Sequence, residues 1–314
     1  MSIYFFQPVF HQKIWGGSTL TDYFHLKEDH IGEDWAISAH PHGPTKIING
    51  ELQGELLNQV WEKHPELFGN PTEKEFPLLM KILDAHEDLS VQVHPNDAYA
   101  KTHGGGLGKT ECWYVIDAEP GAEIVYGHNA KTEEELRTMI DNGEWDKLLH
   151  HVPVKKGDFF YVPSGMIHAI GKGILILEPQ QSSDTTYRLY DYDRKDANGH
   201  LRPLHLKEAL DVITVPSTKV HENYQIKKIN GNKITNFINS PFFSVTKLEV
   251  VNPFQLEREG DFMLGTVVAG TGKITDNDQS YEVSFGSSFL IPNDTPFVDV
   301  VGNLTIILAH PNHQ

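Results

Sequence analysis

The sequence contains very little cysteine and no long apolar run. Its 314 residues include one cysteine, Cys112, which excludes a disulfide framework and a thiolate zinc site and favours a reducing, cytoplasmic setting. The N-terminus, MSIYFFQPVFHQKIWGG, lacks the basic start and apolar stretch of a signal peptide, so we expect none. No segment approaches the roughly 18 apolar residues that span a bilayer, so we expect no membrane span.

Basic residues are also scarce relative to acidic ones. Lys and Arg together number 26 against 43 Asp and Glu, and the net charge is −17. A charge of this sign repels nucleic acid and anionic membranes, so neither is an expected partner. It remains compatible with a small anionic substrate that is held by a few converging basic side chains.

A complete phosphate-binding P-loop is missing as well. The segment HGGGLGKT (103–110) carries His103 where that motif needs its first glycine. The next residues, ECWYVI, are β-branched and aromatic and predict a strand, whereas a P-loop leads into a helix. We therefore expect no nucleotide site here.

Short β-rich segments make up most of the sequence. Segments such as DFFYVPSG, GILILEPQ and LTIILAH are separated at close intervals by Gly, Pro and Asp, which is typical of sandwiches and barrels rather than of βαβ units. Apolar residues at three- and four-residue spacing predict amphipathic helices over 55–69 and 131–152. The expected fold class is therefore mainly β with a few added helices.

An internal repeat divides the chain. Residues 156–171 align with residues 285–300, because a glycine, a strand and a proline recur at equal spacing in both: Gly157 and Pro163 in the first copy, Gly286 and Pro292 in the second. Such a repeat predicts two copies of one β-barrel module. We expect an N-terminal catalytic module over 1–230 and a C-terminal degenerate module without metal ligands over 231–314.

The two copies differ in polarity at the aligned positions. Phe297 stands in the place of His168, and Leu264 stands in the place of Glu111. Polar residues in only one copy indicate that the chemistry belongs to the first module.

Four side chains of the first module form a candidate metal site. Gln92 and His94 are two residues apart on one predicted strand and therefore point to the same side. Glu111 lies on the next strand and His168 on a later one. Two imidazoles, a carboxylate and an amide oxygen suit a divalent metal, with one Zn²⁺ per chain as the first expectation. Each histidine alone would more often be a hydrogen-bonded core residue, but the agreement across separate strands favours the metal.

These spacings resemble those of a known family. Gly157-x5-Pro163-x-Gly165-x2-His168 matches the second cupin motif, and Gln92-x-His94 with Glu111 is similar to the first. The sequence as a whole resembles the type I mannose-6-phosphate isomerases of the cupin superfamily, in their short bacterial form. The segments that carry the likeness are KIWGG (13–17), GEDWAISAHPHGP (32–44), FPLLMKILDAHEDLSVQVHPND (76–97), GKTECWYVI (108–116) and VPSGMIHAIGKGILILEPQQSSDTTYRLYDYDR (162–194).

The resemblance implies roles for individual residues. It implies two cupin (jelly-roll β-barrel) modules, zinc on Gln92, His94, Glu111 and His168, and the isomerisation of mannose 6-phosphate to fructose 6-phosphate. The implied catalytic residues are Arg188, Lys109 and Glu178, and the implied substrate-binding residues are Trp15, Glu33, Ser90, Asp184 and Arg194. Arg194 stands where relatives place a phosphate-binding lysine, and Gly108 stands where some relatives have a histidine.

The chemistry leaves alternatives open. Moving a proton between C2 and C1 of a sugar through a cis-enediol needs a base and an electrophile, and either Lys109 or Glu178 can be the base. A second His-x-His pair, His40 and His42, has no carboxylate at cupin spacing and is interpreted as structural or pocket-lining. The rival functions are a metal-dependent cupin oxygenase and a non-catalytic sugar-binding cupin. The expected oligomeric state is a monomer or a homodimer.

Overall fold

The chain divides into two units, one of which combines two N-terminal segments with the C-terminal part of the chain. The computed structural model describes residues 3–104, 106–196, 198–221, 223–277 and 279–312. We call Met1–Val9, Trp35–Lys81 and Glu222–Gln314 the terminal unit, and Phe10–Asp34 and Ile82–His221 the central unit. The predicted module boundary at residues 230 and 231 remains a prediction.

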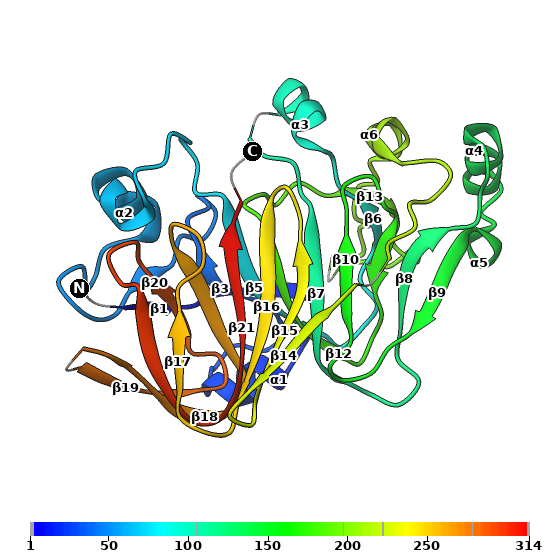
Figure 1. The fold of residues 1–314 in the computed structure, drawn as a ribbon. Helices are drawn as coiled ribbons and strands as arrows, with labels where there is room; N and C mark the ends of the chain where they lie inside the picture. The colour runs from blue at the N-terminus through cyan, green and yellow to red at the C-terminus, as the bar shows by residue number, and fades with distance from the viewer. Residues whose placement is uncertain (1–2, 105, 197, 222, 278, 313–314) are drawn as a thin grey trace. The chain divides into compact units, whose positions relative to one another are not determined.

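The terminal unit is built on a ten-stranded sheet. Its strands follow the order β14-β15-β16-β21-β18-β20-β1-β4, while β17 pairs with β21 and β19 pairs with β18 (Figure 1). The elements of this unit are β1 (Tyr4–Gln7), β4 (Lys46–Ile47), α2 (Leu57–Lys63), the 3-10 helix η1 (Pro65–Phe68), β14 (Gln225–Ile229), β15 (Asn232–Asn239), β16 (Phe243–Val250), β17 (Phe254–Glu257), β18 (Met263–Asp276), β19 (Gln279–Ser284), β20 (Ser288–Ile291) and β21 (Phe297–Pro311).

Alternation of buried and exposed residues shapes the start of β21. Val298 and Val300 are buried, whereas Phe297, Asp299 and Val301 are exposed. Because successive strand residues face opposite sides, this period of two places the valines in the core of the unit. The rest of that core is apolar and includes Leu248, Met263, Val267, Phe289, Ile291 and Ile306.

Two sheets form the framework of the central unit. The five-stranded sheet has the order β13-β6-β11-β8-β9, and the six-stranded sheet has the order β10-β7-β12-β5-β2-β3 (Figure 1). The six-stranded sheet includes β3 (Ile31–Ser38) and β5 (Leu78–Ala85). The other elements are β2 (Val9–Gly17), α1 (Thr19–Phe24), β6 (Val91–Val93), α3 (Asp97–His103), β7 (Glu111–Ala118), β8 (Glu123–His128), α4 (Glu133–Asp141), α5 (Trp145–Leu148), β9 (Leu149–Pro153), β10 (Phe159–Val162), β11 (His168–Ile170), β12 (Ile174–Gln181), β13 (Tyr187–Tyr190) and α6 (Leu206–Val212).

The helix predicted over 131–152 is shorter than expected. Helix α4 begins after Thr132, whose hydroxyl accepts a hydrogen bond from the backbone N–H of Glu135 at 3.1 Å. It stops before Gly143, whose φ of +65° a helix does not allow. A four-residue helix follows, and residues from Leu149 onward pair with β8 as strand β9. The last residues of the predicted helix therefore form a strand, in which Leu149 is buried.

The internal repeat is present in the structure, with one correction. Gly157 and Gly286 both have left-handed φ values, of +90° and +79°, and each precedes a four-residue strand, β10 or β20. The last residue of β10, Val162, pairs with Glu111 on β7, and the last residue of β20 pairs with Met263 on β18. The strand register therefore places Met263, not Leu264, in the position of Glu111.

The predicted fold class is confirmed. Both units consist mainly of antiparallel strands with short helices. In the part of the chain that the structure describes, no helix is long and apolar enough to cross a membrane.

Candidate metal centre and active site

Strand ends in the central unit bring three predicted metal ligands together. His94 directly follows β6, Glu111 begins β7, and His168 begins β11. Their side chains are buried, with exposed fractions of 1%, 0% and 1%. One ligand atom from each lies within 4.8 Å of the other two. Strands that are far apart in sequence therefore deliver the three side chains to one buried point.

Hydrogen bonds to the backbone fix the protonation of both imidazoles. Nδ1 of His94 lies 2.9 Å from the carbonyl oxygen of Thr185, and Nδ1 of His168 lies 2.8 Å from that of Met166. A carbonyl only accepts, so each Nδ1 carries the proton and each Nε2 presents a lone pair. Burial lowers the pKa of both rings, to about 3 for His94, so both are neutral at pH 7.

The converging atoms fit a divalent metal. The two Nε2 atoms are 3.1 Å apart, and neither has a proton to donate to the other. They lie 3.3 and 3.4 Å from the carboxylate of Glu111, whose Oε1 has no hydrogen-bond partner among the described residues. Lone pairs that face one another without a proton repel, and a bound cation removes that repulsion. The donor set therefore fits the metal that the sequence predicts.

Gln92 borders this cluster. It pairs with His168 across the sheet, and its side-chain nitrogen lies 3.5 Å from Nε2 of His168. Its oxygen accepts a 3.4 Å hydrogen bond from the hydroxyl of Ser90. The amide thus reaches the site, and its role as a fourth ligand stays a prediction.

Lys109 inserts its ammonium group among the same atoms. Its Nζ donates to Oε2 of Glu111 at 2.6 Å and to Nε2 of His94 at 3.1 Å, and it lies 3.8 Å from Glu178. Burial lowers the pKa of Lys109, but the two carboxylates outweigh burial and hold that pKa above its usual value. The same pairing holds the pKa of Glu111 well below its usual range, against the opposing effect of burial. Lys109 is therefore a proton-bearing group in this arrangement.

The glycine run before Lys109 allows close packing of the backbone. A Cβ on Gly108 would lie 2.6 Å from backbone atoms of Asn96 and Asp97, at the start of helix α3. The N–H of Gly108 donates to the carboxylate of Asp97 at 2.7 Å. Strand β7 follows directly, as predicted. Gly108 thus leads Lys109 and Glu111 into the site, and the strand that follows replaces the helix that a P-loop needs.

Glu178 approaches Lys109 from β12. Its side chain is buried, and its Oε2 accepts a 2.9 Å hydrogen bond from the indole N–H of Trp113. The sequence offers a signal for Trp113, because residues two apart on a strand share a face and Trp113 is two residues after Glu111. That signal was not used in the prediction.

Arg188 is connected to the metal cluster through Ser90. It pairs with Gln92 between strands β13 and β6, and its Nε donates to the hydroxyl of Ser90 at 3.2 Å. Its NH1 donates to the carbonyl of Pro203 at 2.8 Å. The predicted arginine is thus held from both sides beside Gln92.

Arg194 is bound to neighbouring acceptors. One guanidinium nitrogen lies 2.7 Å from the carboxylate of Asp191, and another donates to the carbonyl of Asp88 at 2.8 Å. Asp191 also binds Arg202 through contacts of 2.5 and 2.7 Å, which the sequence did not indicate. The predicted contact of Arg194 with phosphate stays a prediction.

The other predicted pocket residues also lie in the central unit. Trp15 is buried in the apolar cluster that contains Trp113. Glu33 is buried, lies 3.3 Å from Nζ of Lys13 and contributes to the raised pKa of Lys109. Asp184 is exposed and directly precedes Thr185, whose carbonyl holds His94. Their roles as substrate contacts stay predictions.

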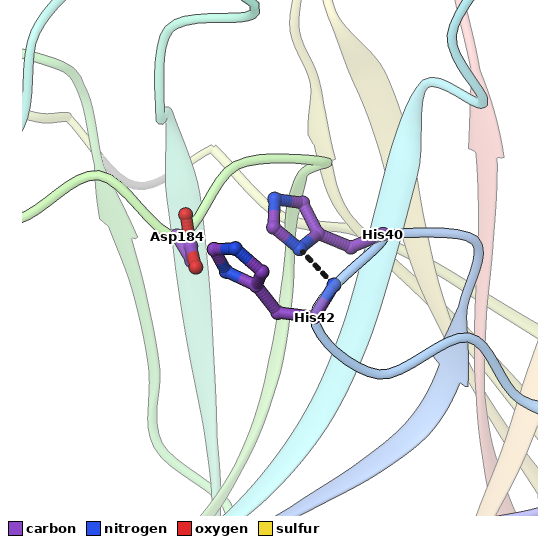
Figure 2. Close-up of side chains that lie close together, drawn as sticks. All are labelled: His40, His42 and Asp184. Atoms are coloured by element: carbon purple, nitrogen blue, oxygen red, sulfur yellow. Dashed lines mark hydrogen bonds between the residues drawn. The ribbon is translucent and has the colours of Figure 1, made fainter.

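The second His-x-His pair lies in the terminal unit. Figure 2 shows the backbone N–H of His42 donating to Nδ1 of His40, at 3.2 Å. The two rings meet edge to face at 4.8 Å, and the His40 ring lies 5.6 Å from that of Trp35. These contacts lie within the turn, and the interpretation of the pair as structural or pocket-lining stays a prediction.

Comparisons with known proteins agree with this arrangement. The model of the type I phosphomannose isomerase catalytic domain matches residues 3–126, and the model of the mannose-6-phosphate isomerase cupin domain matches residues 233–311. The chain is 50% identical over 308 residues to mannose-6-phosphate isomerase ManA of Bacillus subtilis, with 98% of each chain covered. It is 49% identical over 310 residues to mannose-6-phosphate isomerase of Streptococcus mutans, again with 98% of each covered. The crystal structure of mannose 6-phosphate isomerase from Bacillus subtilis superposes with a TM-score of 0.96 at 43% identity, over 99% of this chain and 100% of that one. The chain therefore belongs to the type I phosphomannose isomerase family and is an isomerase with a cupin domain.

Proposed function

We propose that this isomerase interconverts mannose 6-phosphate and fructose 6-phosphate through a cis-enediol, with one Zn²⁺ per chain, in the cytoplasm. The observation that carries the proposal is the buried cluster of His94, Glu111 and His168, which lies beside Lys109 and Glu178. The printed names of the Bacillus subtilis and Streptococcus mutans relatives support the substrate. The single cysteine supports the compartment.

The metal would be held by His94, Glu111 and His168, with Gln92 as the fourth ligand. When bound, Zn²⁺ supplies Lewis-acid stabilisation of the negative charge that develops on substrate oxygen. The two backbone hydrogen bonds keep both rings oriented with Nε2 toward this point, and the hydrogen bond from Lys109 to Nε2 of His94 would be given up to the metal. The site is thus preorganised for a charge that appears only during reaction.

The proton transfer is divided between Lys109 and Glu178. Moving a proton between C2 and C1 needs a base that accepts it and returns it on one face of the sugar. Lys109 is assigned as the donor to substrate oxygen, because its Nζ lies between Glu111 at 2.6 Å and Glu178 at 3.8 Å, and these carboxylates raise its pKa in the metal-free site. Glu178, with one oxygen bonded to Trp113 and the other 3.8 Å from Lys109, is the base in this assignment.

Positive groups complete the site. Arg188, held beside Gln92 by Ser90, stabilises negative charge on the enediolate or on the phosphate. Trp15, Glu33, Ser90 and Asp184 contact the sugar, and Arg194 contributes positive charge toward the phosphate.

A coupled assay that detects fructose 6-phosphate tests the proposal. The assay is run on the purified protein, after chelation and after zinc is restored, with metal content measured on the same samples. We expect activity to be lost with the zinc and to return with it. An inactive protein that retains iron would instead indicate the oxygenase, and an inactive protein without metal would indicate a sugar-binding cupin.

A further inference from the structure

We infer that Trp113 is a positioning residue of the isomerase, because its indole fixes both the orientation of Glu178 and the packing of His168. This inference rests on the proposed function. It concerns a residue that contacts the predicted base and a metal ligand without being either.

The hydrogen bond from Trp113 to Glu178 joins two buried groups. The exposed fraction is 1% for Trp113 and 3% for Glu178, and the indole nitrogen lies 2.9 Å from Oε2. An indole N–H is only a donor, and a buried donor without an acceptor is costly, so Trp113 depends on the carboxylate of Glu178.

This bond restricts the rotation of the carboxylate. The last torsion of a glutamate side chain is broad and is not fixed by intrinsic rotamer preference. With Oε2 bound to Trp113, Oε1 is left on the side of Lys109, 3.8 Å from Nζ. Trp113 therefore fixes the plane of the Glu178 carboxylate, with one oxygen on the indole and the other toward Lys109.

The same ring contacts the metal cluster. The ring centres of Trp113 and His168 are 5.5 Å apart, with an angle of 67° between the planes. Edge-to-face packing of this kind holds an aromatic ring in one orientation. Because Trp113 and Glu111 share one face of β7, a single strand supplies a metal ligand and the support of two further site residues.

The experiment compares Trp113→Phe with a matched control, Trp61→Phe. Both substitutions remove a buried indole N–H, since Trp61 donates to the carbonyl of Lys74 at 3.1 Å in the terminal unit. We expect Trp113→Phe to lower kcat about 10- to 100-fold with KM changed less than about twofold, because a misplaced catalytic group slows the chemical step. Trp61→Phe should retain the wild-type kcat, and both variants should retain zinc.

A double-mutant cycle separates positioning from general damage. In a Glu178→Gln background, Trp113→Phe should lower kcat several-fold less than in the wild type, because the part of its effect that passes through the carboxylate is already lost and only the packing of His168 remains to be disturbed. Equal, additive losses in both backgrounds would contradict the inference. So would a Trp113→Phe variant as active as Trp61→Phe.

Two further outcomes are distinguishable. A wild-type protein without isomerase activity removes the proposed function and this inference with it. If Trp113→Phe does not fold, Trp113→Leu tests the same loss of the donor, and failure of both to fold would make Trp113 a structural residue and the inference wrong.

Discussion

Replacing Lys109 by Met should destabilise the metal-free protein much more than the zinc-loaded one. Lys109 is 4% exposed and is the cationic partner of Glu111 at 2.6 Å and of Glu178 at 3.8 Å. Methionine keeps the length of the side chain and removes its charge. In the metal-free variant two buried carboxylates then remain without this cation.

The size of the effect follows from the burial of the pair. Removing one partner of a buried ion pair costs about 3–5 kcal/mol, because the remaining charge stays buried without compensation. For a protein unit of this size, that lowers Tm by roughly 6–20 °C. A bound Zn²⁺ compensates Glu111 directly, so the loss in the zinc-loaded protein should stay below about 2 kcal/mol.

Thermal melts of both proteins, with zinc and after chelation, measure the difference. If the substitution destabilises the metal-free protein more than the zinc-loaded protein, linkage requires the folded variant to bind zinc more tightly than the wild type does. The affinity should rise roughly tenfold for each 1.4 kcal/mol of difference between the two stability losses. A chelator competition gives this affinity. Lys13→Met is the control, since Lys13 pairs with Glu33 at 3.3 Å but is one-third exposed and should cost about 0–1 kcal/mol, with or without zinc. Equal losses in both metal states, or weaker zinc binding by Lys109→Met, would refute the reasoning.

Three further predictions concern pH, the arginine cluster and a turn. Burial lowers the pKa of His94 from 6.5 to about 3. Below pH 6.5 the unfolded chain therefore binds more protons than the folded chain, and the free energy of unfolding falls as the pH drops from about 6.5 toward 3. Between pH 7 and pH 5 this one group should cost the metal-free protein about 2 kcal/mol, and melts of His94→Asn should show a smaller pH slope. Asp191→Asn should lower the free energy of unfolding by about 1.5–3 kcal/mol, because the carboxylate that binds Arg202 loses its charge. Limited proteolysis should then show faster cleavage after residue 191. Gly165→Ala should cost more stability than Gly157→Ala in parallel melts. Both glycines have φ above +80°, so either substitution strains the backbone. Of the two, only a Cβ at Gly165 would also meet another atom, at 2.5 Å. Equal losses of stability would show that backbone strain, and not this close contact, sets the cost.

The sequence predicted that His94, Glu111 and His168 lie together because strand geometry is simple. His94, Glu111 and His168 each stand at a strand end, and a period of two fixes which way each side chain points. The turn glycines marked where the strands begin. Fold class and metal donors therefore followed from spacing and from the family resemblance together.

The contacts of charged side chains were harder to predict. Long side chains such as Lys109 and Arg194 reach several acceptors, and spacing along the chain does not select among them. Spacing along the chain also did not indicate how closely Glu111 and Glu178 approach Lys109, and the choice of Lys109 or Glu178 as the base stays a prediction. Likewise, the repeat alignment missed by one residue at Leu264, because an alignment of apolar strands has no polar marker that fixes its register.

The two units differ in what they hold at matching positions of the repeat, which supports placing the proposed site in the central unit. In the terminal unit the position of Glu111 is taken by Met263, which is 2% exposed and packs in the apolar core of that unit. In the central unit the same position holds a buried carboxylate together with a lysine and two histidines, and burying such groups costs free energy unless each is paired. The apolar copy needs no such pairing and contributes stability through packing alone.

In the central unit the buried polar groups of the site have partners. Backbone carbonyls accept from the two imidazoles, Lys109 donates to Glu111, and Trp113 donates to Glu178. Each of these partners also sets the direction of a group in the site, so the bonds that make the buried charges tolerable are the bonds that preorganise the site for catalysis.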